Sequence, residues 1–272
     1  MEFYERVSGA RMHAAYHKPG ELFNISIDLK LLQDIILFIR NCYITLNEMH
    51  NILTYNKIWK QRLINIGIYG IRAAQNYGLT GIMSRCVGIK RDVRLSLRDV
   101  YSSYNTLTFK SYISLNGDSY DRFLLRMFEM GESLSITNQC ISTLLNYSKD
   151  KLFISNKFTQ ATNFNSLLIN SKKIKNNIKM YTYMEDLIEY FLNWHSGLYI
   201  KSNISSITIE SPKGEFGVSI ISDNSNKPFR CKIRSPSYHN LQVLPKIVKG
   251  HLLADLATLV GTIDIVFGEI DR

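Results

Sequence analysis

The spacing of apolar residues changes along this chain, from a helical period in its first half to short strand-like runs near its end. Between about residues 27 and 54, isoleucine and leucine recur at steps of three and four residues, which predicts an amphipathic helix. A second long helix is predicted over residues 119–145 and a shorter one over 181–194. Residues 1–146 are therefore expected to be mainly helical.

The C-terminal part has a different pattern of apolar residues. Residues 204–210, 216–222 and 229–234 read as strands, separated by a Ser-Pro-Lys-Gly turn and an Asp-Asn-Ser-Asn turn, and so predict a small antiparallel sheet. Residues 252–259 return to a helical pattern. The last residues, 262–272, are predicted to be an extended or looped tail, too apolar to lie free in water. The fold class expected is α+β: a helical bundle followed by a small antiparallel sheet with flanking helices.

Length and composition are those of an ordered globular protein. The chain has 272 residues, of which 45% are hydrophobic, enough for a normal core. No apolar run reaches the ~18 residues that a membrane span needs, and the first residues contain no hydrophobic signal core. The chain is therefore expected to be neither secreted nor transmembrane by itself.

The four cysteines are Cys42, Cys86, Cys140 and Cys231. They are far apart in sequence and form no CxxC pair, so they indicate neither a zinc site nor a local disulfide framework. We expect four reduced and mostly buried thiols.

The formal charge of +10 is unevenly distributed. Residues 147–180 contain seven lysines and one aspartate, so this segment carries more than half of the excess. We interpret it as a variable basic surface insertion between a helical part, residues 1–146, and an α+β part, residues 181–272. An RNA-binding role would rest on the charge alone, because no recognised RNA-binding motif accompanies it.

No catalytic motif is readable from the residues themselves. The chain has no nucleophile elbow, no phosphate-binding loop and no HExxH pattern. Its six histidines have no neighbouring cysteine or carboxylate pattern that would make a metal-ligand set. The residues alone support only a mixed α/β globular domain.

Several ordered blocks nevertheless resemble the quinone-binding, hydrogenase-like large subunit of respiratory complex I, the proton-pumping NADH:quinone oxidoreductase. They leave roughly residues 146–180 unmatched. The blocks are Phe3–Tyr16, Asn56–Arg62, Ala74–Gly78, Gly81–Arg85, Tyr120–Arg126, Glu210–Gly217, Gly250–Asp255 and Gly261–Arg272.

The resemblance implies a fold similar to the large subunit of nickel–iron hydrogenases, whose C-terminal end carries a cysteine pair for the metal centre. The corresponding end here, Val266–Arg272, contains no cysteine, which excludes thiolate ligation of nickel on this part of the fold. In the complex I family this space is the quinone chamber.

Site residues follow from the resemblance position by position. Asp264, Val266 and Phe267 match the family's terminal segment, which lines the quinone chamber. Asp264 is expected to be a polar contact or to shape the cavity; from sequence alone it could equally be a loop aspartate that accepts backbone hydrogen bonds. Lys213 and Gly214 match the family's hairpin turn, where turn geometry and surface charge would also explain them.

His13 matches a family histidine close to the terminal iron–sulfur cluster, which a neighbouring subunit holds. A cluster that gains an electron would favour the protonated form of a nearby imidazole. Arg11 is expected to add positive potential there. The alternative for His13 is an ordinary buried histidine.

The function implied is that of a non-autonomous subunit of NADH:ubiquinone oxidoreductase. The proton donors of the family lie on an N-terminal half that these residues do not match, so no catalytic residue is expected here. We expect a split subunit, whose other half is a separate polypeptide, and poor solubility of this chain alone. An assembly or structural component that has lost quinone chemistry is the alternative.

The cofactors, partners and location follow from the same resemblance. No metal, flavin or NADH site is expected; ubiquinone is the implied substrate, and the iron–sulfur cluster belongs to a partner. Other partners are the remaining peripheral-arm and membrane-arm subunits. The implied location is the matrix-side arm at the mitochondrial inner membrane, and the Asn-, Ile-, Tyr- and Lys-rich composition indicates an organelle-encoded gene.

Overall fold

The computed structural model describes residues 1–13, 29–96, 103–149, 184–197 and 199–271. The elements of the first part are all helical: α1 (Glu2–Ser8), α2 (Leu29–Met49), the π-helical turn η1 (His50–Thr54), α3 (Lys57–Leu63), α4 (Ile71–Asn76), α5 (Ile82–Arg85), α6 (Val93–Ser96), the 3-10 turn η2 (Tyr104–Thr106) and α7 (Ser119–Lys149). The second part contains α8 (Met184–Ser196), strands β1 (Asn203–Ser211), β2 (Gly214–Ser222) and β3 (Arg230–Arg234), and helices α9 (Pro236–Leu241), α10 (Leu244–Ile247), α11 (Leu253–Ile263) and α12 (Phe267–Asp271). The predicted α+β class is confirmed.

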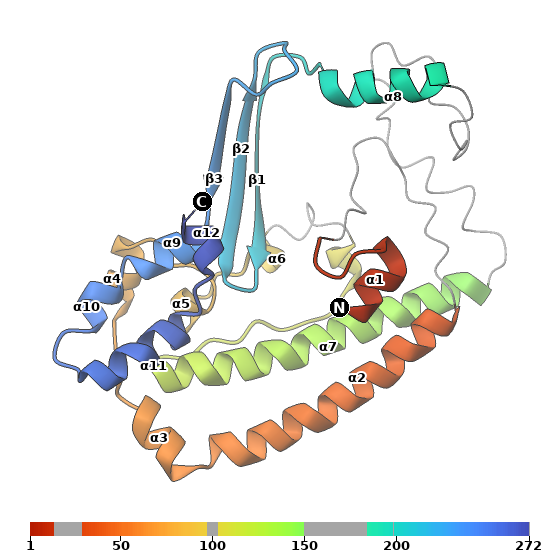
Figure 1. Ribbon diagram of the computed structural model, residues 1–272. Coiled ribbons are helices and arrows are strands. Elements are labelled where there is room, and N and C mark those ends of the chain that lie inside the picture. Colours follow the sequence, from red (N-terminus) through yellow and green to blue (C-terminus); the bar gives the residue numbers. More distant parts are fainter. Residues whose placement is uncertain (14–28, 97–102, 150–183, 198, 272) are drawn as a thin grey trace.

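The two longest helices, α2 and α7, run alongside each other (Figure 1). Leu32 and Ile39 of α2 and Ile141 of α7 form a small buried cluster between them, because the apolar stripe of an amphipathic helix needs a partner surface. Helix α7 begins at Ser119, as the sequence predicts. Just before it, the Asp118 carboxylate accepts the backbone N–H of Asp121 at 2.8 Å, which caps the helix.

The main core lies where α7 meets the short helices. Met83 and Cys86 of α5 and the following turn pack with Leu125 of α7, Val243 before α10 and Leu259 of α11. Each of these side chains is at most 2% exposed. The C-terminal helices are thereby joined to a core that the first half of the chain begins.

The three strands form one antiparallel sheet in the order β1-β2-β3. Ile207, Val218 and Ile233 lie opposite one another in its register, so they share a face. That face is apolar, yet its isoleucines are exposed: Ile207, Ile209, Ile220 and Ile233 by 59%, 44%, 41% and 48%. The other face is mostly polar. The sheet extends away from the helices as a long ribbon (Figure 1), and the end that contains the β1–β2 turn contacts α6, α9 and the core region.

The chain end differs from its prediction. Residues 262–272 were expected to be extended or looped, but α11 continues to Ile263, and α12 adds a further helical segment. Asp264 separates the two helices with a left-handed backbone, φ 61° and ψ 60°. Asp and Asn tolerate this conformation better than most residues, and a single left-handed residue ends one helix without preventing another from following.

The expectation of mostly buried cysteines is wrong. Cys86 is buried, Cys42 is intermediate, and Cys140 and Cys231 are exposed. Cys231 lies on the uncovered face of the sheet, opposite Ile220, and so escapes the core, as Cys140 does on α7.

The cysteines should differ in reactivity. Burial raises the pKa of the Cys86 thiol, although Arg122 opposes it, and a thiol of raised pKa holds little reactive thiolate. We expect maleimide to label Cys140 and Cys231 at least about tenfold faster than Cys86. Peptide mass spectrometry of the folded chain and of the urea-unfolded chain measures this; similar rates for all three in the folded chain would contradict the burial of Cys86.

Most of the predicted basic insertion, residues 147–180, lies outside the described residues. Residues 27–28 and 181–183, at the starts of two predicted helices, also lie outside them. The three-part domain division stays a prediction. In the described part of the chain, no helix is long and apolar enough to cross a membrane.

Candidate functional site

The β1–β2 turn, residues 211–214, brings Lys213 to the core. Ser211 and Gly214 are paired at the end of the ladder. Gly214 has φ +139° and Gly81 has φ +66°, and a Cβ added to Gly81 would lie 2.6 Å from the Gly214 Cα. Two backbones can approach so closely only where neither residue has a side chain.

Polar contacts fix the turn in this position. Asn240, which is buried, donates its amide to the Lys213 carbonyl at 3.1 Å and accepts the backbone N–H of Thr80 at 3.3 Å. The Thr80 hydroxyl in turn accepts the backbone N–H of Glu215 at 3.2 Å. The loop before α5, the turn and helix α9 are thereby joined by direct hydrogen bonds.

This placement brings Lys213 to Asp264. The Lys213 ammonium donates to one carboxylate oxygen of Asp264, and Arg126 Nε lies 3.6 Å from the other. Arg126 also donates to the Thr262 carbonyl at 2.7 Å. All three charged side chains are partly exposed, by 27%, 34% and 23% for Lys213, Asp264 and Arg126.

Residues after Asp264 add an apolar surface. Val266 and Phe267 are 43% and 65% exposed. Their segment is held by Ser237 of α9, whose hydroxyl donates to the Glu269 carboxylate, and α12 lies beside α9 (Figure 1). The structure therefore brings Lys213 of the turn to the segment that contains Asp264, Val266 and Phe267; the sequence analysis named the lysine and this segment separately.

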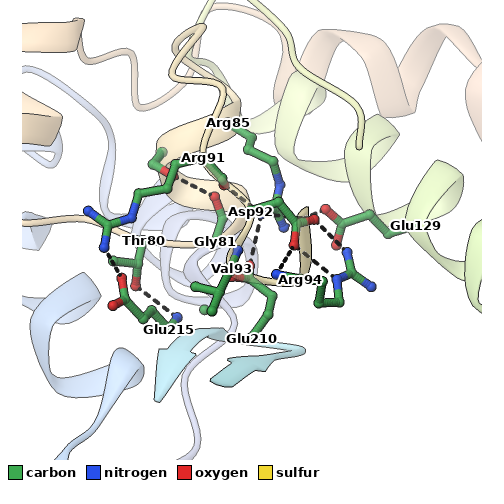
Figure 2. Close-up of polar contacts among 12 residues, drawn as sticks. Thr80, Gly81, Arg85, Arg91, Asp92, Val93, Arg94, Glu129, Glu210 and Glu215 are labelled. Atoms are coloured by element: carbon green, nitrogen blue, oxygen red, sulfur yellow. Dashed lines mark hydrogen bonds and ion pairs between the residues drawn. The ribbon is translucent and has the colours of Figure 1, made fainter. Parts of the chain in front are cut away.

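A buried ion cluster holds the base of the hairpin, on the strand side of the turn. Arg85, 2% exposed, donates to Glu129 of α7 at 2.6 Å and to Glu210 of β1 at 2.8 Å. Asp92 lies 3.9 Å from the same guanidinium and accepts Arg94 at 2.7 Å. Figure 2 shows these side chains converging from the helices and the strand.

A second group of ion pairs lies on the β2 side of the β1–β2 turn. Glu215, the residue after Gly214, is buried and pairs with Arg91 at 2.8 Å and Arg234 at 3.2 Å. Arg91, Thr80 and Glu215 appear together at the left of Figure 2, apart from the Arg85 cluster. Ion pairs therefore hold the hairpin on both sides of its turn.

The pKa values of the residues in the Arg85 cluster are shifted in different directions. Burial alone would lower the pKa of Arg85, but Glu129, Glu210 and Asp92 outweigh it and the pKa is raised. Burial raises the pKa of Glu210 by more than Arg85 lowers it, and Asp92 adds repulsion. Burial would also raise the pKa of Asp92, but Arg94 outweighs it, and that pKa is lowered. The raised pKa of Arg85 therefore depends on the three carboxylates around it.

His13 and Arg11 lie away from this site. Both are exposed in the segment after α1, and Arg11 donates to Glu5 at 2.9 Å. His13 is thus no ordinary buried histidine within this chain. The geometry brings neither residue to Lys213 or Asp264.

The arrangement is suited to binding and orienting a ligand. Among the residues that the structure describes, no group of three or more His, Cys, Asp or Glu side chains could hold a metal ion. What the site offers is a cation pair on one carboxylate beside exposed apolar side chains. Such a combination suits a ligand with a polar head and an apolar body.

Sequence reasoning missed Arg126, Asn240 and the role of Arg85. Arg85 and Arg126 stand in blocks that carry the family resemblance, but nothing local shows that one meets Glu210 and the other Asp264. The available signal for Arg126 was its position one helical turn after Arg122, which puts both arginines on the same side of the helix. Asn240 gave none.

Comparisons with known proteins agree over the whole chain. A family model described as "Respiratory-chain NADH dehydrogenase, 49 Kd subunit" matches residues 1–272. The NADH-ubiquinone oxidoreductase 49 kDa subunit of Paramecium tetraurelia is 54% identical over 273 residues, covering 100% of this chain and 66% of the relative. The same subunit of Acanthamoeba castellanii is 43% identical over 274 residues, covering 100% and 63%.

A bacterial protein is similar as well. An NADH-quinone oxidoreductase subunit of Rickettsia typhi is 41% identical over 275 residues, covering 100% of this chain and 65% of the relative. The chain therefore spans somewhat less than two thirds of the length of the curated relatives it matches.

Proposed function

This chain belongs to the family of the respiratory-chain NADH dehydrogenase 49 kDa subunit, and from that premise we propose that it forms part of the quinone-reduction chamber of a proton-pumping NADH:ubiquinone oxidoreductase. It would act at the matrix side of the mitochondrial inner membrane. Electrons would arrive from an iron–sulfur cluster in a partner subunit. The chain itself contributes chamber wall, charge and contacts between subunits.

One observation carries the proposal: Lys213 and Asp264 meet beside the exposed side chains of Val266 and Phe267. The turn and the chain end are 51 residues apart in sequence. Asn240 and the two glycines fix the turn, and Arg126 and Ser237 hold the chain end. A quinone has polar carbonyl oxygens on an apolar ring, and this surface complements both.

His13 and Arg11 have a separate part in the proposal. Their exposure leaves them free to meet a neighbouring subunit, where the resemblance puts the terminal iron–sulfur cluster. A protonated His13 would be favoured when that cluster is reduced. If substitution of His13 leaves the pH dependence of the cluster's midpoint potential unchanged, this part is wrong.

The other class of function is an assembly or structural component of the same complex. The exposed apolar face of the sheet is what such a component would bury against partners, but it serves a working subunit equally. Mass spectrometry of the native complex, combined with its NADH:quinone activity, separates the two. The same spectrum tells whether a second polypeptide supplies the family sequence that lies outside this chain.

Asp264→Asn tests the site most directly. Asn also tolerates the left-handed backbone at this position, so the variant removes the charge and leaves the chain path. We expect the KM for ubiquinone to rise about tenfold, since one charge-assisted contact is worth about 1.5–3 kcal/mol. Electron transfer from NADH to a water-soluble acceptor that precedes the quinone should stay within about twofold.

The matched control is Asp223→Asn, in the exposed β2–β3 loop, where the carboxylate accepts a hydrogen bond from Ser225. It should leave both activities unchanged. Equal loss of the two activities in Asp264→Asn would point to a failure of assembly and would count against the site.

A further inference from the structure

Arg122 of α7 is a buried cation without a carboxylate. Its side chain is fully buried, and among the described residues no acidic group lies within ion-pair distance of it. Its guanidinium donates to the Gly67 and Gly117 carbonyls at 3.2 and 3.1 Å and to the Ser119 hydroxyl at 2.8 Å. These neutral acceptors solvate the guanidinium but cancel none of its net charge.

Arg126 brings a second cation to the same place. It lies one helical turn further along α7 and donates to the Arg122 carbonyl at 3.1 Å. Both arginines also reach Thr262, Arg122 through the hydroxyl at 3.5 Å and Arg126 through the carbonyl. Their charges therefore converge on the segment that leads into Asp264.

The charge count of this group is unbalanced. Within ion-pair distance, Arg122, Arg126 and Lys213 have one carboxylate among the described residues, Asp264, which leaves a local surplus of cations; Glu129 acts on Arg126 from farther away. In contrast, the Arg85 cluster next to it has more carboxylates than arginines. The surplus is thus a local property, not a reflection of the chain's overall charge.

The contacts of Arg126 reflect this surplus of positive charge. Arg126 Nε is buried without a hydrogen-bond acceptor, and its 3.6 Å separation from Asp264 is too long for a hydrogen bond. Burial lowers the pKa of Arg126; Asp264 and, more weakly, Glu129 oppose that shift, and Arg122 reinforces it. An added anionic oxygen would supply the missing acceptor and relieve the repulsion between the arginines.

We propose that the group Arg122–Arg126–Lys213 around Asp264 binds an anionic oxygen on a quinone-type ring, in preference to the same ring uncharged. The inference rests on the proposed function, since it names the charge state that the quinone site favours. Val266 and Phe267 would contact the ring, and Lys213 and Arg126, the two partly exposed cations, would face the oxygen. Arg122 acts behind them through its field.

A pair of ring compounds tests the charge preference. 2-Hydroxy-1,4-naphthoquinone is an anion at neutral pH, and its 2-methoxy ether has nearly the same shape without the charge. Both are tested as competitors of ubiquinone in the membrane-bound complex that contains this chain. We expect Arg126→Gln and Lys213→Gln each to weaken inhibition by the anion about tenfold, which corresponds to about 1.4 kcal/mol, and inhibition by the ether less than about twofold.

Two further variants serve as controls. Arg126→Lys keeps the charge and should retain most of the anion's affinity, and Lys232→Gln removes an exposed cation from β3, outside the group, and should change neither inhibitor. If Arg126→Gln prevents assembly, Lys213→Gln makes the same measurement at a partly exposed side chain.

The outcomes distinguish a failure of the charge preference from a failure of the proposed function. Equal weakening of both inhibitors, or no weakening of either, overturns the charge preference. If neither compound competes with ubiquinone in the unmodified complex, the charge preference for this ring is overturned; the proposed function fails only if Asp264→Asn also leaves the KM for ubiquinone unchanged.

Discussion

Replacing Gly81 by alanine should abolish most of the assembled complex. The new Cβ would lie 2.6 Å from the Gly214 Cα, which is backbone and cannot turn aside as a flexible side chain would. The backbone of Gly81, φ +66° with ψ −140°, is also unfavourable for any side chain. Backbone strain costs about 1–3 kcal/mol and overpacking about as much again, against a net stability of about 5–15 kcal/mol for a typical domain.

The measurement is the amount of variant chain in the native complex, together with its resistance to limited proteolysis. Gly131→Ala in the middle of α7 is the matched control, because a Cβ there meets nothing within 4 Å and alanine is the better helix former by about 1 kcal/mol. It should assemble normally. A Gly81→Ala complex with a normal yield and an unchanged KM for ubiquinone would mean that the turn does not need this close approach.

Replacing Arg85 by methionine should be nearly as damaging, for an electrostatic reason. Methionine has a similar length but leaves Glu129 and Glu210 facing each other and Asp92 without the positive charge between them. Removing one partner of a buried ion pair typically costs about 3–5 kcal/mol, because the remaining charge stays buried. The expected result is a large loss of complex and faster proteolysis near β1.

Two comparisons isolate the buried charge. Glu5→Gln removes only the charge of the exposed pair with Arg11 and should cost at most about 1 kcal/mol. Arg85→Met combined with Glu210→Gln should recover part of the lost stability, since the buried carboxylate whose pKa is already raised no longer carries a charge. A double variant that is as unstable as the sum of both single variants would show that packing, and not charge, explains the effect of Arg85→Met.

The sequence predicts what depends on neighbours in the chain. Helix α7 begins at the predicted Ser119 because a capping aspartate and a periodic apolar stripe are both local signals. The strands are within two residues of their predicted limits, since the turn that joins β1 to β2 contains proline and glycine. The resemblance also named Lys213 and the segment of Asp264, Val266 and Phe267, and the structure shows that Lys213 contacts Asp264; their role at a quinone site stays a prediction.

What the sequence does not predict depends on residues far apart. The partners of Arg85 come from positions 129 and 210, and no spacing rule connects them. The helix α12 was missed because the tail's apolar residues suggested burial without a period long enough to indicate a helix. The exposure of Cys140 and Cys231 was missed because residue type gives only an average burial, and each lies on a face that this chain leaves uncovered.

The uncovered isoleucine face of the sheet has a consequence for how much of this chain a cell can hold. Four isoleucines exposed side by side on paired strands are a ready template for sticking to another copy. If partner subunits of the proposed complex cover this face, any chain made in excess of them would aggregate or be degraded. Synthesis of this chain in step with those partners would then matter as much as correct folding.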